Sequence, residues 1–212
     1  MLHPYVAEPA SSPDLRQLLE ELYQGQSLQP YQSGQLIPMS PDEVWIVSRG
    51  VVQLSTLYPN GEEALLGLVS PSMPFGLPFT LIYPYQATAL SDVDLMRLTM
   101  AEIEQSPTLA QGIFRHLTRR LRQTEAFLAL AGHRRVEDRL RQLLLLLRQE
   151  VGQTTQTGVR LGVRLTHQHL ANAIGTTRVT VTRLLGQFRD EGWLSIGTDR
   201  HIVLPYRLPG LR

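Results

Sequence analysis

The segment from Thr166 to Leu185 constrains the fold more than any other part of the chain. It reads as a short helix, a sharp turn and a second helix. Ala171 is small enough to let two helices touch, Gly175 permits the positive φ of a sharp turn, and Val181 offers a β-branched contact that locks the second helix onto the first. This spacing predicts a helix-turn-helix motif, with an ordinary helical hairpin as the alternative.

Charge is divided unevenly along the chain, although the net charge is only +1. Residues 1–133 contain seven arginines and thirteen acidic residues, a net charge of −6. Residues 134–212 contain thirteen arginines and six acidic residues, a net charge of +7. All basic residues are arginine, whose planar guanidinium suits bidentate contact with phosphate or guanine. The asymmetry indicates an acidic module joined to one that binds a polyanion, unless it is an ordinary bias between domains.

The second helix of the motif carries the side chains that we expect to read DNA. Arg178 at its tip can donate two hydrogen bonds to guanine, Val179 can contact a thymine methyl group, and Arg183 lies on nearly the same face. Strand-like segments at 159–165 and 192–204 complete a winged helix-turn-helix. Five further residues are expected to contact phosphates, which position the protein without specifying a sequence: Thr166, Gln168, Thr177, Thr180 and Thr182.

The chain between residues 28 and 98 has the pattern of an antiparallel β structure. Asn60-Gly61 is a strong hairpin signal because these residues tolerate the two positive-φ positions of a tight turn. We expect a compact barrel or sandwich, preceded by a helix at 12–25. Short apolar runs between turn residues predict strands at 44–47, 51–57, 65–69 and 87–98.

A long helix is predicted to begin at Pro107 and to carry a narrow apolar seam. A seam of this width is typical of a two-helix coiled coil and predicts a homodimer, with packing against its own domain as the alternative. A short helix at 100–104 precedes it, and an amphipathic helix at 136–149 and a polar loop at 152–158 follow. The seam residues recur at alternating steps of three and four: Phe114, Leu117, Leu121, Thr124, Leu128 and Ala131.

These features predict an α+β chain in three parts. Residues 1–106 would form an N-terminal antiparallel β-roll with its N-terminal helix, 107–133 a dimerisation helix, and 134–212 a winged helix-turn-helix domain. Because cysteine is absent, disulfides, thiolate zinc sites, cysteine nucleophiles and cysteine-held iron–sulfur clusters are excluded. No apolar run is long enough to span a membrane and no signal-peptide pattern is present, so we expect a cytoplasmic protein without membrane partners.

No set of side chains favours catalysis. The paired acids Glu62-Glu63 and Asp92/Asp94 lie on turns or alternating strands, where solvation is the ordinary state. The six histidines do not form a metal-ligand set, so no metal is predicted. We therefore expect a binding protein and not an enzyme. A small-molecule-binding or cyclase-like enzyme with a winged motif for partner contact is the alternative.

A β-roll with glycines at 34, 50, 61 and 76, a dimerising helix and this winged motif together resemble the CRP/FNR superfamily of transcription regulators, from about residue 15 to 204. The stretch 175–186 is similar to the cyanobacterial nitrogen-regulator branch, as are Arg120 and segments 123–125, 131–134 and 139–140. The resemblance implies a cyclic-nucleotide-binding-like sensor and a homodimer that binds a palindrome of double-stranded DNA with a GTA-like half-site. It also implies an activator or a repressor working with RNA polymerase.

The resemblance also defines a candidate effector site. Cyclic-nucleotide binders of the superfamily carry Phe-Gly-Glu and then an Arg that holds the phosphate, whereas here Leu77 follows Gly76 and Tyr85 replaces the Arg, which argues against cyclic AMP. For 2-oxoglutarate, the family's ligand, one of two expected arginines is missing near Tyr83. Another small anion, or no effector at all, remains open. The residues that match the family's effector site are Phe75, Gly76, Leu77, Arg120 and Glu125.

Overall fold

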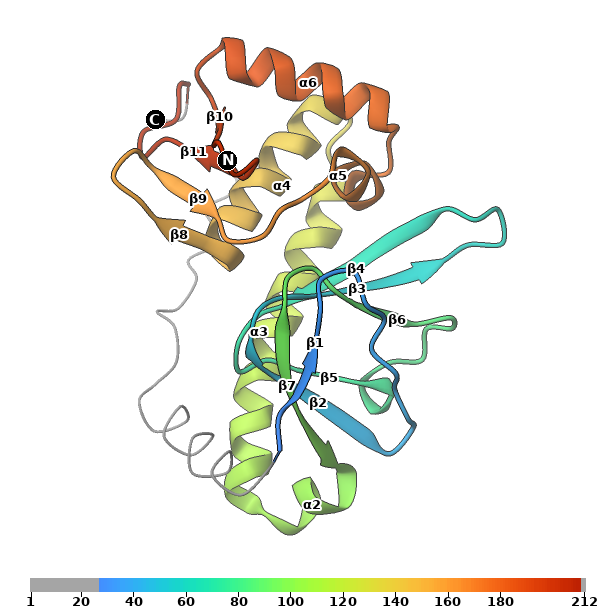
Figure 1. Cartoon of the computed structure of the whole chain (residues 1–212). Coiled ribbons are helices and arrows are strands. Elements are labelled where there is room, and N and C mark those ends of the chain that lie inside the picture. Colours follow the sequence, from blue (N-terminus) through green and yellow to red (C-terminus); the bar gives the residue numbers. More distant parts are fainter. Residues whose placement is uncertain (1–26, 211–212) are drawn as a thin grey trace.

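A computed structural model describes residues 27–210, so the helix predicted at 12–25 lies outside the described residues. Within them, a β-sheet domain is followed by helices and a second, smaller sheet, which confirms the predicted α+β class (Figure 1). In this part of the chain, no helix combines the length and the apolar character that crossing a membrane requires.

Two antiparallel sheets make up the β-roll, with strand orders β1-β7-β2-β5 and β4-β3-β6. The hairpin predicted at Asn60-Gly61 joins β3 to β4, and its tip extends away from the roll (Figure 1). The elements of this domain are β1 (Gln29–Tyr31), β2 (Glu43–Arg49), β3 (Val52–Leu57), β4 (Glu63–Val69), β5 (Pro74–Phe75), the 3-10 turn η1 (Leu77–Phe79), β6 (Gln86–Ala89) and β7 (Val93–Thr99).

The single strand predicted at 87–98 is wrong, because the chain turns between β6 and β7 and the two strands belong to different sheets. The turn passes so close to Gly50 that a Cβ there would lie 2.3 Å from the Asp92 carbonyl oxygen. Gly50 also has a φ of +87°, so both conformation and space require glycine at this position. A tertiary contact therefore divides what the alternating sequence presents as one strand.

Strand β2 is buried on both faces, which explains its uninterrupted apolar run. Trp45 and Val47 point into the interior of the roll, whereas Val44 and Ile46 belong to a second cluster formed with the helices that follow β7. The second cluster attaches α2 (Met100–Gln105) and α3 (Pro107–Ala131) to the outside of the roll.

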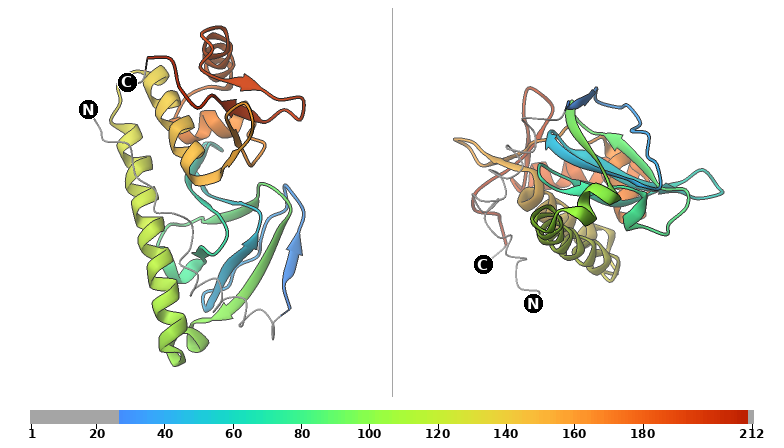
Figure 2. Two further views of the ribbon diagram at one scale, coloured as in Figure 1. Left: turned by 90° about the vertical axis from the view of Figure 1, so that its left-hand side faces the viewer. Right: turned by 90° about the horizontal axis from the view of Figure 1, so that it is seen from below.

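Helix α3 is the longest element and connects the two ends of the molecule. It begins where the Ser106 side chain accepts a hydrogen bond from the Leu109 amide, with Pro107 in the first turn, as the sequence predicts. After the bend at 132–135, α4 (Val136–Val151) runs back alongside α3, and Figure 2 shows the two helices side by side. The helices predicted at 100–104, 107–131 and 136–149 are confirmed.

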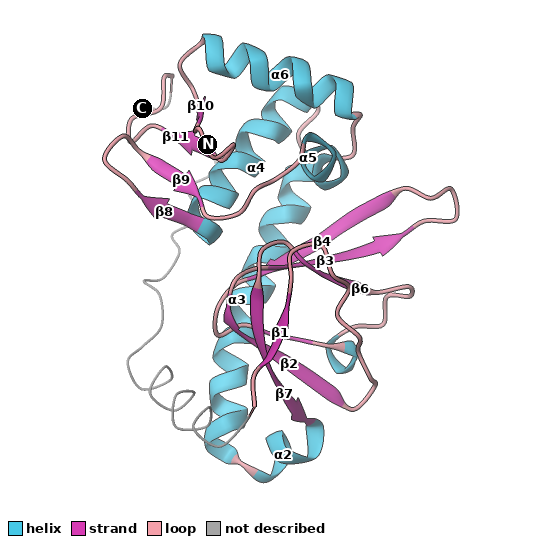
Figure 3. Ribbon diagram, in the orientation of Figure 1, coloured by secondary structure: helices cyan, strands magenta, loops and turns pink. Residues whose placement is uncertain are grey.

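The C-terminal part packs a three-helix core against a small sheet with strand order β10-β11-β9-β8 (Figure 3). The polar segment 152–158 is only partly a loop, because β8 takes up its first three residues; all three are exposed, so no apolar pattern marks the strand. The strand predicted at 159–165 ends at Leu161. The elements are β8 (Gly152–Thr154), β9 (Val159–Leu161), α5 (His167–Ile174), α6 (Arg178–Asp190), β10 (Ser195–Ile196) and β11 (Ile202–Leu204).

Candidate nucleic-acid interface

Helix α5 and the turn after it adopt the geometry that the motif predicts. The Thr166 hydroxyl caps α5 by accepting a hydrogen bond from the His169 amide at 3.0 Å. Gly175 ends the helix in the left-handed region, with φ +61° and ψ +57°. Because nothing lies within 4 Å of where a Cβ would be, backbone conformation alone favours glycine here. Ala171 and Val181 are both fully buried between the two helices.

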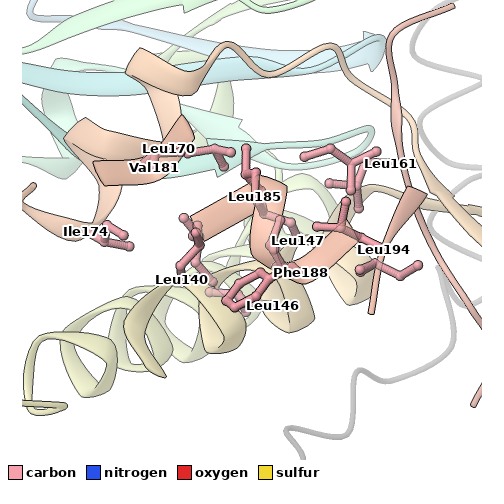
Figure 4. Packing of buried hydrophobic residues seen from close by; sticks show 14 of the residues in the cluster. Leu140, Leu146, Leu147, Leu161, Leu170, Ile174, Val181, Leu185, Phe188 and Leu194 are labelled. Atoms are coloured by element: carbon pink, nitrogen blue, oxygen red, sulfur yellow. The ribbon is translucent and has the colours of Figure 1, made fainter. Parts of the chain in front are cut away.

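Helix α6 is anchored by one face and leaves the other free. Figure 4 shows Val181, Leu185 and Phe188 pointing toward residues of α4 and α5 such as Leu140 and Leu170. At the other end, the Arg141 guanidinium lies 4.1 Å from the centroid of the Phe188 ring and 5.1 Å from that of Trp193. It also donates to Glu191 at 2.6 Å. These contacts fix α6 as a rigid support.

The free face of α6 carries the three predicted base-reading residues. Arg178, Val179 and Arg183 are all exposed, and 79% of Val179 is accessible. Within residues 27–210, no carboxylate pairs with either guanidinium, so both retain all their hydrogen-bond donors. The structure therefore presents two unpaired cations and an apolar group on one side of a braced helix.

The five predicted phosphate contacts lie around this face, but their hydroxyl and amide groups are not equally available. Thr177 caps α6 by accepting from the Thr180 amide at 3.2 Å, and the two hydroxyls are 3.0 Å apart. Thr182 donates its hydroxyl proton to the Arg178 carbonyl at 2.9 Å, which leaves no proton for a phosphate in this arrangement. Gln168 donates to Asn172 at 2.6 Å. Thr166 is exposed beside the start of α5.

Two arginines that the motif does not single out support the interface from behind. Arg139 donates to the carbonyl oxygen of Ile174, at the end of α5, and to that of His133, in the bend between α3 and α4. Arg141 braces α6 as described above. Arg141 also pairs with Glu137, one turn away on α4, at 3.0 Å, but the spacing of the two arginines on α4 gives no signal of their contacts with the bend, α5 and α6. In the wing, Arg160 is paired with Asp199 at 2.7 Å.

The structure brings some of the candidate effector residues together, but not all of them. Phe75 is fully buried in the roll, with Gly76 and Leu77 directly after it. The Arg120 guanidinium reaches this segment from α3, donating to the Pro74 carbonyl at 3.3 Å and to the Tyr85 hydroxyl at 2.8 Å. Glu125 is exposed and points elsewhere, since five residues along a helix correspond to about 140° of rotation.

The Tyr85 end of the Arg120 contact is buried, whereas Arg120 itself is only half-buried. Burial raises the pKa of the Tyr85 phenol, although the neighbouring Arg120 guanidinium opposes that change. Tyr85 therefore stays neutral at physiological pH, and its hydroxyl oxygen accepts the hydrogen bond from Arg120.

The predicted dimer seam faces away from the β-roll over most of its length. Phe114, Leu121 and Leu128 are 69%, 59% and 74% exposed. Thr124 and Ala131 are also exposed. Leu117 differs, because it is half-buried against the cluster that joins α3 to the roll. The opposite face of α3 covers its own domain, so the helix has one occupied side and one apolar side that residues 27–210 leave uncovered.

Comparison with known proteins agrees with this geometry. Residues 138–208 match the model of the Crp-like helix-turn-helix domain. The chain is 36% identical over 169 residues to the global nitrogen regulator of a Nostoc species, which covers 75% of this chain and 76% of the relative. It is 32% identical over 209 residues to the global nitrogen regulator of Synechococcus elongatus, covering 92% and 94%. These relatives are transcription regulators and not enzymes.

Solved structures show the same architecture. A CRP/FNR-family transcriptional regulator from Thermus thermophilus is 27% identical, with a TM-score of 0.68 over 84% of this chain and 93% of that one. FixK2 from Bradyrhizobium japonicum, at 21% identity, shares the fold with a TM-score of 0.71, over 84% and 92% of the two chains. On the strength of these relatives and its braced, cation-bearing second motif helix, the chain belongs to the CRP/FNR family of DNA-binding transcription regulators.

Proposed function

We propose that the protein works as a homodimer that reads a two-fold symmetric DNA site, with one α6 in each of two major grooves about 34 Å apart. The observation that carries this proposal is the free face of α6, where Arg178, Val179 and Arg183 are exposed, unpaired and held on a rigid core. Pairing through the seam on α3 supplies the symmetry, because that face is apolar and none of the described residues covers it.

Each exposed residue has a role in this proposal. Arg178 is the chief base reader, through bidentate bonds to a guanine of a GTA-like half-site, with Arg183 and Val179 as secondary contacts. Thr166, Gln168, Thr177 and Thr180 contact phosphates. Thr182 contributes only if its hydroxyl turns away from the Arg178 carbonyl.

The test begins by selecting genomic fragments that the protein binds and reading their shared half-site. Arg178→Ala should then lower affinity by about 1–3 kcal/mol and relax the preference at one base position. Arg164→Ala, at an exposed residue just before α5, is the matched control: it should weaken all sequences alike and flatten the salt dependence. If Arg178→Ala left the footprinted specificity intact, the assignment of this reader would be wrong.

We further propose that residues 1–106 form the sensor part, 107–133 the dimerisation helix and 134–212 the DNA-binding part, in a cytoplasmic regulator that contacts RNA polymerase and acts as an activator. An effector would act only through different affinities for DNA-competent and DNA-incompetent arrangements. The family relationship supports these points. A small anion beside Arg120 and the 75–77 segment, with 2-oxoglutarate as one candidate, fits the effector role.

A second candidate is a constitutive DNA binder whose β-roll has lost its ligand. The contact from Arg120 to Tyr85 and Pro74 favours it, because the guanidinium already has internal partners. DNA affinity measured with and without 2-oxoglutarate or cyclic AMP separates the two. A change in affinity that disappears in Arg120→Gln supports the sensor, whereas unchanged affinity with every small anion tried supports the constitutive binder.

A further inference from the structure

A buried polar junction joins the β-roll, α3 and α4 at one place. The Gln123 side chain on α3 is 1% exposed, and its oxygen accepts a hydrogen bond from the backbone amide of Leu68 on β4 at 3.0 Å. Its nitrogen donates to Glu150 Oε2, in the last turn of α4, at 3.0 Å. Arg119 donates to the same oxygen at 3.3 Å. One amide side chain therefore spans three elements.

The β-roll leaves room for this arrangement. A Cβ on Gly67 would lie 3.1 Å from the Gln123 side-chain oxygen, so a larger residue at position 67 would press on the amide. The register of β3 with β4 shifts between Leu54 and Ser55, opposite this stretch of β4. The backbone of the sensor sheet and the side chain of the dimerisation helix are thus fitted to each other.

The junction does not follow from stability alone. The Glu150 side chain is 2% exposed and, within residues 27–210, its second oxygen has no hydrogen-bond partner. Burying a carboxylate with an incomplete set of partners costs free energy, and apolar replacements of such groups are often neutral or stabilising. Polar groups instead fix the relative orientation of the elements that they join. Their hydrogen bonds are satisfied in one relative placement, whereas apolar contacts tolerate sliding.

The junction lies where it can fix the angle between α3 and α4. Glu150 lies at the end of α4 remote from the α3–α4 bend, so the hydrogen bond to Gln123 fixes the angle between the two helices. Helix α4 forms one wall of the core against which α6 packs (Figure 4). We propose that Gln123 and Glu150 are positioning residues that set the orientation of α6 relative to the dimerisation helix, and hence the half-site spacing that the dimer accepts.

The proposal rests on the dimeric DNA-binding function, and its test separates the two. Gln123→Glu places two carboxylates where an amide met a carboxylate, and Gln123→Glu with Glu150→Gln restores a complementary pair in reversed order. Gln111→Glu makes the same chemical change on an exposed position of α3 and serves as the control. Because the chain has no cysteine, an added Asp190→Cys at the end of α6 provides one spin label per subunit.

Two measurements are made on the full-length protein. The first is the distance distribution between the two labels without DNA, and the second is affinity for duplexes whose half-sites are one base pair closer, at the selected spacing, or one base pair further apart. Gln123→Glu should shift or broaden the distance distribution and lower affinity at the selected spacing at least about tenfold, with a changed preference among spacings. The reversed pair should return both to wild type, and Gln111→Glu should alter neither.

Reduced thermal stability with an unchanged distance distribution and an unchanged spacing preference would overturn the proposal, since that is the signature of a merely structural contact. If Gln123→Glu fails to fold, the Gln123→Met, Glu150→Met pair decides: a folded protein of wild-type stability that keeps the wild-type spacing preference also overturns it. A wild-type protein that binds no spaced duplex contradicts the proposed function instead, while the label distances still test the positioning.

Discussion

At the scale of single residues, glycine is required for two separate reasons: a positive φ, and the lack of space for a Cβ. Gly50 is required both by its positive φ and by the closeness of the Asp92 carbonyl. Gly175 has a positive φ but open space around it. Gly186, inside α6, has neither constraint, so comparison of these three glycines separates the steric from the conformational reason for the residue.

Gly175→Ala should therefore lower the free energy of unfolding by about 1 kcal/mol, through backbone conformation alone. Gly186→Ala is the matched control and should raise stability by about 0.5–1 kcal/mol, because a helix interior favours alanine and the site is open. Urea denaturation of both variants provides the measurement. The two changes in the free energy of unfolding need not be equal in size. An increase in Gly175→Ala would contradict the assigned turn.

His116 gives the chain a specific sensitivity to acid. Burial, followed by the Arg119 and Arg115 charges, lowers the pKa of its imidazole to about 4, and its Nε2 has no hydrogen-bond partner within the described residues. Since the pKa is depressed on folding, the neutral form contributes stability above about pH 6.5 that is lost as the pH falls toward 4. The unfolded chain takes up the proton more readily in that window.

His116→Gln should remove this component. Between pH 6.5 and 4, the variant should lose about 1–2 kcal/mol less of its free energy of unfolding than the wild type, after allowing for solvent screening. Denaturant titrations at three pH values across the window measure the difference. Parallel pH profiles for the two proteins would show that folding does not depress the pKa of the imidazole.

At the scale of elements, α3 has two faces with different tasks. One face packs on the roll through Leu109 and Ile113, and the other carries Phe114, Leu121 and Leu128 in the open. Half-buried Leu117 lies at the border between them. A partner subunit can therefore cover the exposed face of α3 without disturbing the packing of the other face on its own domain.

Leu121→Glu should dissociate the proposed dimer while leaving the subunit folded. A charge in a paired apolar seam would raise the dimer dissociation constant at least about 100-fold, because the carboxylate would have to be buried without a partner. Sedimentation velocity measures the change, and circular dichroism checks the fold. Leu81→Glu, at a fully exposed leucine far from α3 in sequence, is the control and should remain dimeric.

At the scale of the whole molecule, the DNA-binding part and the β-roll share one hydrophobic cluster, which includes Val51, Leu68 and Leu90 from the roll. A polar contact adds to it: Glu63 on β4 accepts a hydrogen bond from Asn172 on α5 at 3.0 Å. Glu63 also accepts from Gln53 on β3 at 2.9 Å. The hairpin is thus tied directly to the first helix of the motif.

Asn172→Asp should loosen this connection by setting two carboxylates against each other. We expect the amides of β4 and α5 to exchange hydrogen at least about threefold faster than in the wild type, and the added Glu63→Gln change to slow them again. Hydrogen exchange followed by mass spectrometry gives the comparison. Exchange rates unaffected by either substitution would mean that the apolar cluster alone holds the two parts together.

Much of this architecture could be predicted from local signals. The spacing of Ala171, Gly175 and Val181 indicates the motif, and Asn60-Gly61 indicates the hairpin, because each depends on a few neighbouring residues. The division of 87–98 into two strands and the strand at Gly152–Thr154 could not be predicted, since a distant backbone contact determines the first and backbone pairing without apolar residues the second. Similarly, nothing local to Arg120, Gln123 or Glu150 marks their partners, which lie 27 to 55 residues away.

Besides the shared apolar cluster, the DNA-binding part has three attachments to the rest of the chain: the covalent link at 132–135, the last turn of α4, which contacts Gln123, and α5, which contacts Glu63 on β4 (Figures 1 and 2). A rigid body that is held at three points not on one line cannot rotate. When one attachment is lost, it can rotate about the axis through the other two. Loss of the α4 attachment and loss of the α5 attachment therefore leave different rotation axes. Helix α6 can then reorient in a different direction in each case.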